Sequence, residues 1–189
     1  MVPMISTFVL AIVLGIVAVF LFWIVYLYNR MVTLRNRINN AWSQIDVQIR
    51  RRYDLIPNLV ETVKGYAAHE KQVFQKVTEA RASMAAATTV AEQAQAQNQI
   101  TQALKSLFAV AEAYPQLKAN ENFMMLQEEL SGTESKIAYA RQFYNDTVMA
   151  FNTLIQSFPA RMLAPAFGFT ERDYFPMDEA AREPVKVQF

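Results

Sequence analysis

Few side chains in this 189-residue sequence are suited to catalysis or metal binding. His69 is the only histidine and cysteine is absent, so the chain has no thiol nucleophile, thiolate metal ligand or disulfide. A di-iron site in a helical bundle needs Glu-x-x-His pairs, and Tyr66 stands where the glutamate would be. We predict that His69 is an exposed helical residue and that the protein binds no metal or other cofactor.

Other familiar catalytic arrangements are also missing from the sequence. A Ser-His-Asp triad would have to use His69, and no Gly-x-Ser-x-Gly elbow is present. The four glycines are too widely separated to form a phosphate-binding loop. A basic surface interleaved with aromatic residues would indicate nucleic-acid binding, and the sequence does not show one. We therefore predict a protein that is not an enzyme and has no nucleic-acid partner.

Arg52 and Glu70 are charged residues at positions where a seven-residue apolar repeat predicts burial. A lone buried charge is costly, so each needs a partner or a route to solvent. We predict that Arg52 pairs with Glu134, with Asn145 or Gln127 nearby, and that the pair sets helix register rather than acting as a switch. The alternative is that the Arg52 stem covers apolar surface while its guanidinium stays in water.

The elements that carry these residues are predicted to be helices, because glycine is rare and hairpin dipeptides are missing. Heptad spacing indicates three helical stretches, over about residues 29–87, 90–114 and 120–158. Pro57 should kink or break the first stretch, since proline lacks an N–H and clashes with the preceding turn. The fold class is all-α: one N-terminal transmembrane helix, then a long-helix antiparallel bundle with four helices if that break occurs.

Local signals refine the second and third stretches. Thr89 and Glu92 fit a capping box at the start of the second. Its Gln- and Ala-rich part, residues 91–102, is interpreted as a solvated end. The third stretch keeps its seven-residue spacing across Gly132, from Phe123 to Phe158, which predicts one continuous helix.

The N-terminal apolar run has the length of a membrane span. Phe8 to Tyr28 contains no charged residue, and a helix of that length is about 31 Å long, close to the thickness of the hydrocarbon core. A cleaved signal peptide is the alternative, but the basic n-region and the small residues of a cleavage site are missing. We predict an uncleaved anchor in which Ala11-x-x-x-Gly15 is a weak signal for helix pairing. The anchor residues are Phe8, Gly15, Phe20, Trp23, Tyr26 and Tyr28.

Basic residues predict the orientation of this anchor. Arg30, Arg35 and Arg37 follow the apolar run, and no Lys or Arg precedes it. The positive-inside rule then places the N-terminus outside and the remaining chain in the cytoplasm, on a cell (inner) membrane crossed once.

Three segments follow from these boundaries: an anchor over residues 1–29, a cytoplasmic helical bundle over 30–158, and a C-terminal tail over 159–189. The tail contains prolines and is expected to be irregular. We expect its aromatic residues to pack back on the bundle and Asp178 to Phe189 to be loose. These aromatic residues are Phe167, Phe169, Tyr174 and Phe175.

Several short motifs resemble those of the LemA family. They are Asn40-Ala41-Trp42-Ser43-Gln44-Ile45-Asp46-Val47-Gln48, Arg51-Arg52-Tyr53-Asp54-Leu55-Ile56-Pro57-Asn58-Leu59-Val60, Tyr114-Pro115-x-Leu117-Lys118, Leu126-Gln127-x-x-Leu130-x-x-Thr133-Glu134, Ala140-Arg141-x-x-Tyr144-Asn145 and Phe158-Pro159. The likeness covers nearly the whole chain in order. It implies a membrane-anchored four-helix bundle and no settled activity. Polar residues at matching positions are interpreted as a structural polar seam, formed by Arg52, Asp54, Glu134, Arg141 and Asn145.

Two functions remain open at this point. The first is a non-enzymatic, membrane-anchored scaffold or adaptor that binds the lipid bilayer and either copies of itself or a membrane protein such as a protease. The second is a membrane-tethered sensor that binds a small ligand between bundle helices. The side chains proposed to line such a site are Trp42, Met124, Met125, Tyr144 and Met149.

Overall fold

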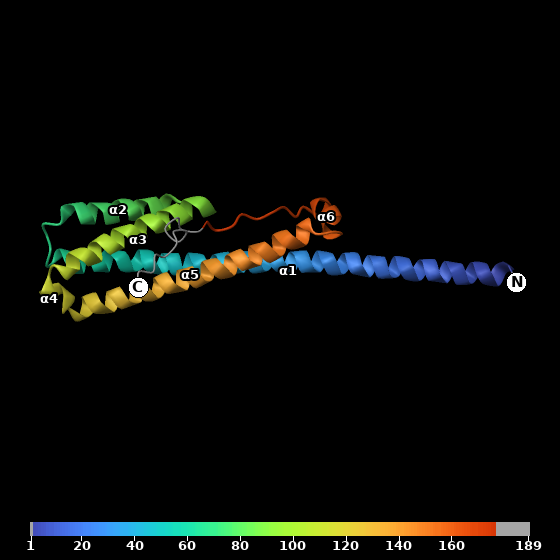
Figure 1. Ribbon diagram of the computed structural model, residues 1–189, viewed down its shortest axis with the longest axis horizontal. Helices are drawn as coiled ribbons and strands as arrows, with labels where there is room; N and C mark the ends of the chain where they lie inside the picture. The colour runs from blue at the N-terminus through green and yellow to red at the C-terminus, as the bar shows by residue number, and fades with distance from the viewer. Residues whose placement is uncertain (1, 177–189) are drawn as a thin grey trace, which may run out of the picture. The chain divides into compact units, whose positions relative to one another are not determined.

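A computed structural model describes the backbone of residues 2–176 and the side chains from Phe8 onward. This part of the chain is helical and contains no strand, which confirms the all-α fold class. Asp178 to Phe189, predicted to be loose, lie outside the described residues. The elements are α1 (Val2–Lys64), α2 (Lys71–Ala86), α3 (Val90–Glu112), α4 (Pro115–Lys118), α5 (Glu121–Gln156), α6 (Ala160–Leu163) and the 3-10 helix η1 (Pro165–Phe167) (Figure 1).

The residues group into two compact units. One, called here the span unit, joins Met1–Asn40 to Asp146–Arg172. The other, the bundle unit, joins Ala41–Asn145 to the described residues 173–176. Helices α1 and α5 each contribute residues to both units. The division of the chain into residues 1–29, 30–158 and 159–189 stays a prediction.

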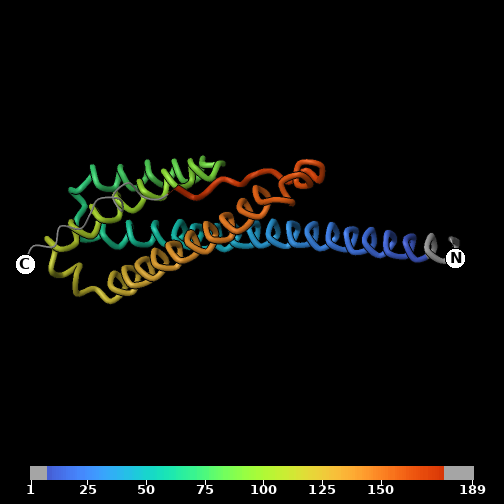
Figure 2. The backbone as a smooth tube through the Cα atoms, turned by 45° about the vertical axis from the view of Figure 1, so that its right-hand side comes forward, coloured from blue at the N-terminus to red at the C-terminus, as the bar shows by residue number. Residues whose placement is uncertain are grey.

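The bundle unit is built from the C-terminal part of α1, from α2 and α3, and from the first part of α5. Consecutive helices reverse direction, and α2 and α3 lie side by side (Figures 1 and 2). Each helix turns an apolar stripe inward, as the heptad spacing predicts. The buried residues include Ile45, Ile56, Leu59 and Val63 of α1, Phe74 and Val77 of α2, Ile100 and Leu107 of α3, and Leu130 and Ile137 of α5.

The expected break at Pro57 is wrong, because α1 continues through this residue to Lys64. A proline inside a helix costs roughly 3 kcal/mol. Its neighbours Ile56 and Leu59 are fully buried, and burying each such side chain contributes about 1.5–3 kcal/mol. Core packing therefore outweighs the local cost, and the helix stays intact.

The first long stretch is interrupted instead after Lys64, where α1 ends, and helix resumes with α2 at Lys71. Glu70 lies just before α2 and is half-buried, so it is a loop residue rather than a core charge. His69 is exposed, as predicted, but lies in this turn and not in a helix. Ala67 is buried in this turn, and its N–H donates to the Val63 carbonyl at 2.9 Å.

The predictions for α3 and α5 are confirmed at their main points. Thr89 accepts a hydrogen bond from the Glu92 N–H while the Glu92 carboxylate accepts one from the Thr89 N–H, which completes the capping box. Helix α5 runs unbroken through Gly132. Its seven-residue stripe is buried as far as Phe151, whereas Phe158 is 82% exposed because the helix has already ended at Gln156.

The span unit contains the apolar start of α1, the last part of α5, α6 and η1. From Phe8 to Tyr26 most of the large apolar side chains of α1 are exposed. The helix becomes covered at Leu27 and Met31, which are buried together with Phe151 and Phe169. The change along one helix, from exposed apolar surface to a protein-covered face, marks the end of the candidate membrane span.

Candidate functional site

The Arg52 cluster is a group of four polar side chains that joins three helices of the bundle unit. Arg52 of α1 is only 2% exposed. Its Nη1 donates to Gln97 Oε1 at 3.0 Å and its Nη2 to Thr101 Oγ1 at 3.1 Å, both on α3. The same Nη2 lies 2.5 Å from Glu134 Oε2 on α5, and Thr101 donates to Glu134 Oε1 at 3.3 Å. The guanidinium thus fixes the register of α1, α3 and α5.

The structure brings Arg52 and Glu134 together, as the sequence predicted. The alternative, a guanidinium in water, is wrong because the side chain is buried. The neighbours expected around the pair are also wrong. Gln127 is exposed, and Asn145 is bonded to the backbone of Phe175 instead.

The cluster is completed by Gln97, which the sequence analysis missed. We interpreted residues 91–102 as a solvated end, yet Gln97 is fully buried and Ala96 lies in the core. Gln97 comes three residues before Ile100 and seven before Leu104, so its position on the inner face was readable from helical spacing. Because glutamine is polar, Gln97 was not counted among the residues of the inner face. Besides accepting from Arg52, its Nε2 lies 3.0 Å from Met84 Sδ.

Burial and neighbouring charges act in opposite directions on Arg52. Loss of solvation lowers the pKa of its guanidinium, the Glu134 carboxylate raises that pKa, and the positive charge of Arg141 lowers it further. Arginine starts from so high a value that it stays charged at physiological pH. The cluster is therefore a permanent buried cation held by one carboxylate and two neutral acceptors. The polar atoms of the cluster point at one another, so the arrangement stabilises the packing of α1, α3 and α5.

Side chains of α5 hold the C-terminal tail through hydrogen bonds to its backbone. Asn145 Nδ2 donates to the Phe175 carbonyl at 3.0 Å, and the Phe175 N–H donates to Asn145 Oδ1 at 2.8 Å. The Tyr144 hydroxyl donates to the Asp173 carbonyl at 3.0 Å. An asparagine amide offers a donor and an acceptor side by side, so it pairs with the N–H and C=O of one extended residue.

The side chain of Phe175 fills an aromatic site in the bundle unit. It is 2% exposed, its ring centroid lies 6.3 Å from that of Trp42, and the Arg141 guanidinium lies 4.5 Å above it. Trp42 also contacts the Tyr144 ring at 5.6 Å. Arg141 and Asn145 of the predicted polar seam thus hold the tail, whereas Asp54 is exposed and takes no part in the Arg52 cluster.

In the span unit, Asn152 binds the backbone of the tail in the same way as Asn145. Its Nδ2 donates to the Arg172 carbonyl and its Oδ1 accepts from the Arg172 N–H, both at 2.9 Å. Phe169 is buried against Phe151 and Tyr28. The prediction that tail aromatic residues pack back on the helices is confirmed for Phe169 and Phe175.

The predicted anchor residues lie along the apolar run, and the predicted topology residues follow it. An 18-residue window of α1 has a mean hydropathy of 3.1 and no buried residue, which meets the length and composition of a membrane span. Phe8 and Phe20 are exposed, and no side chain approaches the position that a Cβ of Gly15 would take. Arg30 Nη1 donates to the Tyr26 hydroxyl at 3.2 Å. The guanidinium of Arg35 lies 5.2 Å above Phe169, and Arg37 is exposed.

The ligand pocket proposed between bundle helices does not form from the predicted residues. Met124, Met125 and Met149 are each about half exposed, on the surface of α5. Tyr144 and Trp42 pack against each other and against Phe175. Helical spacing alone did not show that these methionines face outward.

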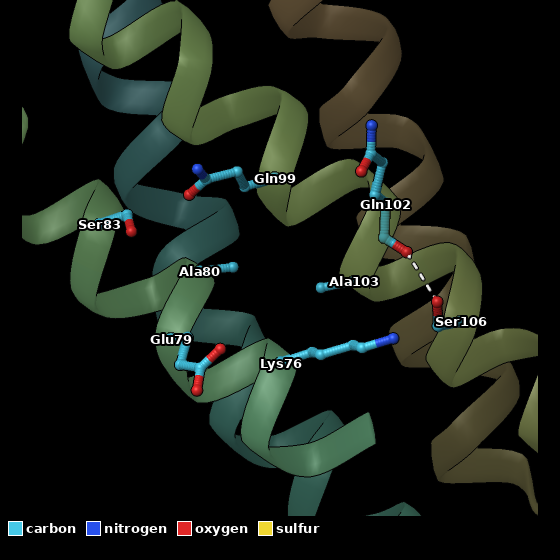
Figure 3. Close-up of a pocket in the computed structure, with 8 residues that line it drawn as sticks. All are labelled: Lys76, Glu79, Ala80, Ser83, Gln99, Gln102, Ala103 and Ser106. Carbon is cyan, nitrogen blue, oxygen red and sulfur yellow. Dashed lines mark hydrogen bonds between the residues drawn. The ribbon is translucent and has the colours of Figure 1, made fainter. Parts of the chain in front are cut away.

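The hollow between α2 and α3 is open and polar (Figure 3). Its volume is about 380 Å³. One lysine and one glutamate lie on its α2 wall, and Ser106 donates to the Gln102 carbonyl on its α3 wall. Within residues 2–176, no three His, Asp or Glu side chains gather to hold a metal ion. The lining residues are Lys76, Glu79, Ala80, Ser83, Gln99, Gln102, Ala103 and Ser106.

Comparison with known proteins identifies the family of this fold. The sequence model of the LemA family matches residues 41–189, which is most of the chain and includes the Arg52 cluster and both asparagines that hold the tail. The chain belongs to the LemA family. This LemA-family chain is 27% identical over 199 residues to magnetosome protein MamQ 2 of Paramagnetospirillum magneticum and to magnetosome protein MamQ of Magnetospirillum gryphiswaldense. Each alignment covers 92% of this chain and 73% of the relative.

A further relative is protein LemA of Metamycoplasma hominis, 26% identical over 173 residues, with 90% of this chain and 79% of the relative covered. The match to the LemA family begins at Ala41, just after the first arginines, and the alignments with individual relatives cover nearly all of this chain. Together with the apolar helix, they support membrane association of this LemA-family protein.

Proposed function

We propose that this protein is a membrane-anchored, non-enzymatic helical scaffold that acts at the cytoplasmic face of its membrane. The observation that carries the proposal is the continuity of α1. One unbroken helix of 63 residues contains both the candidate span and the residues that enter the bundle core. A partner bound to the bundle would be held at the membrane through this helix. The arginines that follow the span favour the cytoplasmic side.

The way the polar groups are used supports a scaffold rather than a catalyst. Both Nη atoms of Arg52 are bonded to side chains of the same cluster, and the Asn145 amide is bonded to the Phe175 backbone. The only histidine is an exposed turn residue. Relatives that are named as magnetosome proteins favour a role in membrane organisation.

An exposed apolar stripe on α5 is the surface that we assign to the partner. Tyr139 is 74% exposed and Phe143, one turn later, is 50% exposed. Residues four positions apart lie on one face of a helix. Aromatic side chains at such a position are typical of binding surfaces. The partner is a second copy of this chain or another membrane protein.

Site-specific photo-cross-linking in intact membranes tests the proposal. A photoreactive phenylalanine analogue replaces Tyr139 in the full chain, and the same analogue at Gln95, an exposed residue of α3, serves as the matched control. We expect a reproducible adduct from position 139, either a dimer of this chain or one defined membrane protein. Adducts from position 139 that are no stronger than those from position 95 would contradict the scaffold.

A further inference from the structure

The segment that follows α5 in the span unit exposes large apolar side chains. Phe158 is 82% exposed, Met162 73% and Phe167 43%. Arg161 is the only charged residue between Asp146 and Glu171. A short segment that is this apolar and this exposed needs a reason, because burying each of these side chains would contribute about 1.5–3 kcal/mol.

This segment is packed directly on the end of the candidate span. The ring centroid of Tyr28 lies 5.1 Å from that of Phe167 and 5.9 Å from that of Phe169. One turn earlier, Val25 of α1 is 56% exposed, whereas Leu27 and Met31 are buried. The segment therefore lies where the lipid-facing part of α1 ends.

The charges of the span unit suit an anionic lipid surface. Beyond Tyr28, this unit carries the arginines at positions 30, 35, 37, 161 and 172 against Asp146 and Glu171. Aromatic and methionine side chains next to arginines are typical of segments that lie in the interface between headgroups and acyl chains. Arginine pairs readily with lipid phosphate.

We propose that α6 and η1 form a second membrane contact, which inserts Phe158, Met162 and Phe167 into the interface of the bilayer that α1 crosses and pairs Arg161 with lipid phosphate. The contact rests on the proposed anchoring of α1. Because Asn152 holds the backbone of Arg172, and the buried Phe169 contacts Tyr28 of α1 and Phe151 of α5, the segment is fixed against α1 and α5. Two contacts would restrict the rotation of α1 about its own axis in the membrane.

The absence of native cysteine makes a depth measurement direct. A single cysteine is placed at position 162 (Met162→Cys) in the full chain and labelled with an environment-sensitive fluorophore. The protein is reconstituted in vesicles of zwitterionic and anionic phospholipid, with and without brominated acyl chains as quenchers. Met149→Cys is the matched control, because Met149 is also an exposed methionine of the span unit, about 10 Å along α5 from the end of that helix at Gln156. Val19→Cys reports the span itself.

We expect bromolipid to quench the probes at positions 19 and 162, and to quench position 162 at least about twofold more than position 149. Quenching at 19 with equal, weak quenching at 162 and 149 would overturn the second contact and leave the anchor standing. Loss of quenching at 19 would overturn the anchor as well. A disulfide between two copies through position 162 in a parallel unlabelled sample, together with no quenching in the labelled one, would assign the patch to self-association and overturn the proposal.

A charge reversal tests the role of the arginine. Arg161→Glu should reduce quenching at position 162 in anionic vesicles and leave quenching at position 19 unchanged, because only the interfacial contact loses its phosphate partner. Unchanged quenching at both positions would overturn the assignment of Arg161 to lipid phosphate.

Discussion

Arg52 Nη2 and Glu134 Oε2 lie 2.5 Å apart, yet the arginine side chain is 3% exposed and the glutamate side chain 45% exposed. The cation is thus buried while its partner reaches the surface. A buried charge that loses its partner costs more than the pair contributes when intact. The two residues should therefore respond unequally to substitution.

Removal of the carboxylate by Glu134→Ala should destabilise the protein by about 1–3 kcal/mol, because the buried guanidinium is left with neutral acceptors only. The same substitution should cost much less in an Arg52→Met background, where no cation remains. Urea unfolding of the four variants in detergent, followed by circular dichroism, measures the coupling. Equal costs in both backgrounds would show that the pair does not hold the helices together.

The neighbouring arginine supplies a control for this experiment. Arg51 Nη2 lies 2.7 Å from Glu129 Oε2, but both side chains are almost half exposed. Exposed ion pairs contribute about 0–1 kcal/mol. Arg51→Ala should therefore change stability little, although the sequence places the two arginines side by side.

Asn145→Ala should release the tail at Phe175. It removes both hydrogen bonds to the backbone of that residue and should weaken docking of the tail by about 1–3 kcal/mol. Because the Phe175 ring contacts Trp42, docking can be followed by Trp42 fluorescence in a Trp23→Phe background. Trypsin should also cleave faster after Arg172.

Asn58→Ala is the matched control for the tail experiment, since Asn58 is an exposed asparagine of α1. Its fluorescence and cleavage rate should equal those of the parent. A parent-like cleavage rate in Asn145→Ala as well would mean that the aromatic contacts alone hold the tail.

The capping box of α3 should make the stability of the fold depend on pH. Hydrogen bonds from the Thr89 and Thr88 N–H groups, and then from the Thr88 hydroxyl, lower the pKa of Glu92 from 4.5 to about 2. A carboxylate with a lowered folded-state pKa stabilises the fold above its unfolded value, and this stability is lost as pH falls toward the folded value. The melting temperature should therefore fall between pH 4.5 and about 2.

Glu92→Gln should remove that part of the pH dependence, because glutamine does not titrate. Comparison of melting temperature against pH for the parent and the variant isolates the contribution of Glu92. Parallel curves over the whole acid range would contradict it.

Gly132→Ala should stabilise the protein by roughly 0.5–1 kcal/mol, because glycine is unfavourable inside a helix. Apart from its chain neighbours and the nearby backbone of its own helix, no atom lies within 4 Å of the position that the new methyl group would occupy. Gly168→Ala should instead destabilise it, since Gly168 has a φ of 72°, which residues with a Cβ rarely adopt. Thermal unfolding of both variants compares the two sites, and a loss of stability in Gly132→Ala would indicate a close partner on that face.

The success of sequence reasoning differs from element to element. The seven-residue spacing predicted α5 to within two residues at each end, and Thr89 with Glu92 predicted the start of α3. A different, local rule predicted a kink or a break at Pro57. The helix does not break there, because burial of Ile56 and Leu59 outweighs the local cost.

The candidate site shows the same limit. Arg52 was recognised because a charge stood in an apolar stripe, and Glu134 because it lay at the edge of another stripe. Gln97 was missed because glutamine is common on helix surfaces, and only packing of α3 against α1 and α5 buries it.

The sequence by itself determined the apolar span, the helical class and the family, because hydrophobic length, helical period and residue motifs are properties of the chain read locally. Only the tertiary structure decided which acceptors meet Arg52, that Asn145 and Asn152 hold the tail, and that the methionines of α5 face outward. Those outcomes depend on which segments distant in sequence come within hydrogen-bonding distance. Every residue carries backbone polar groups, so the sequence does not show which side chain will bond to those of a given residue.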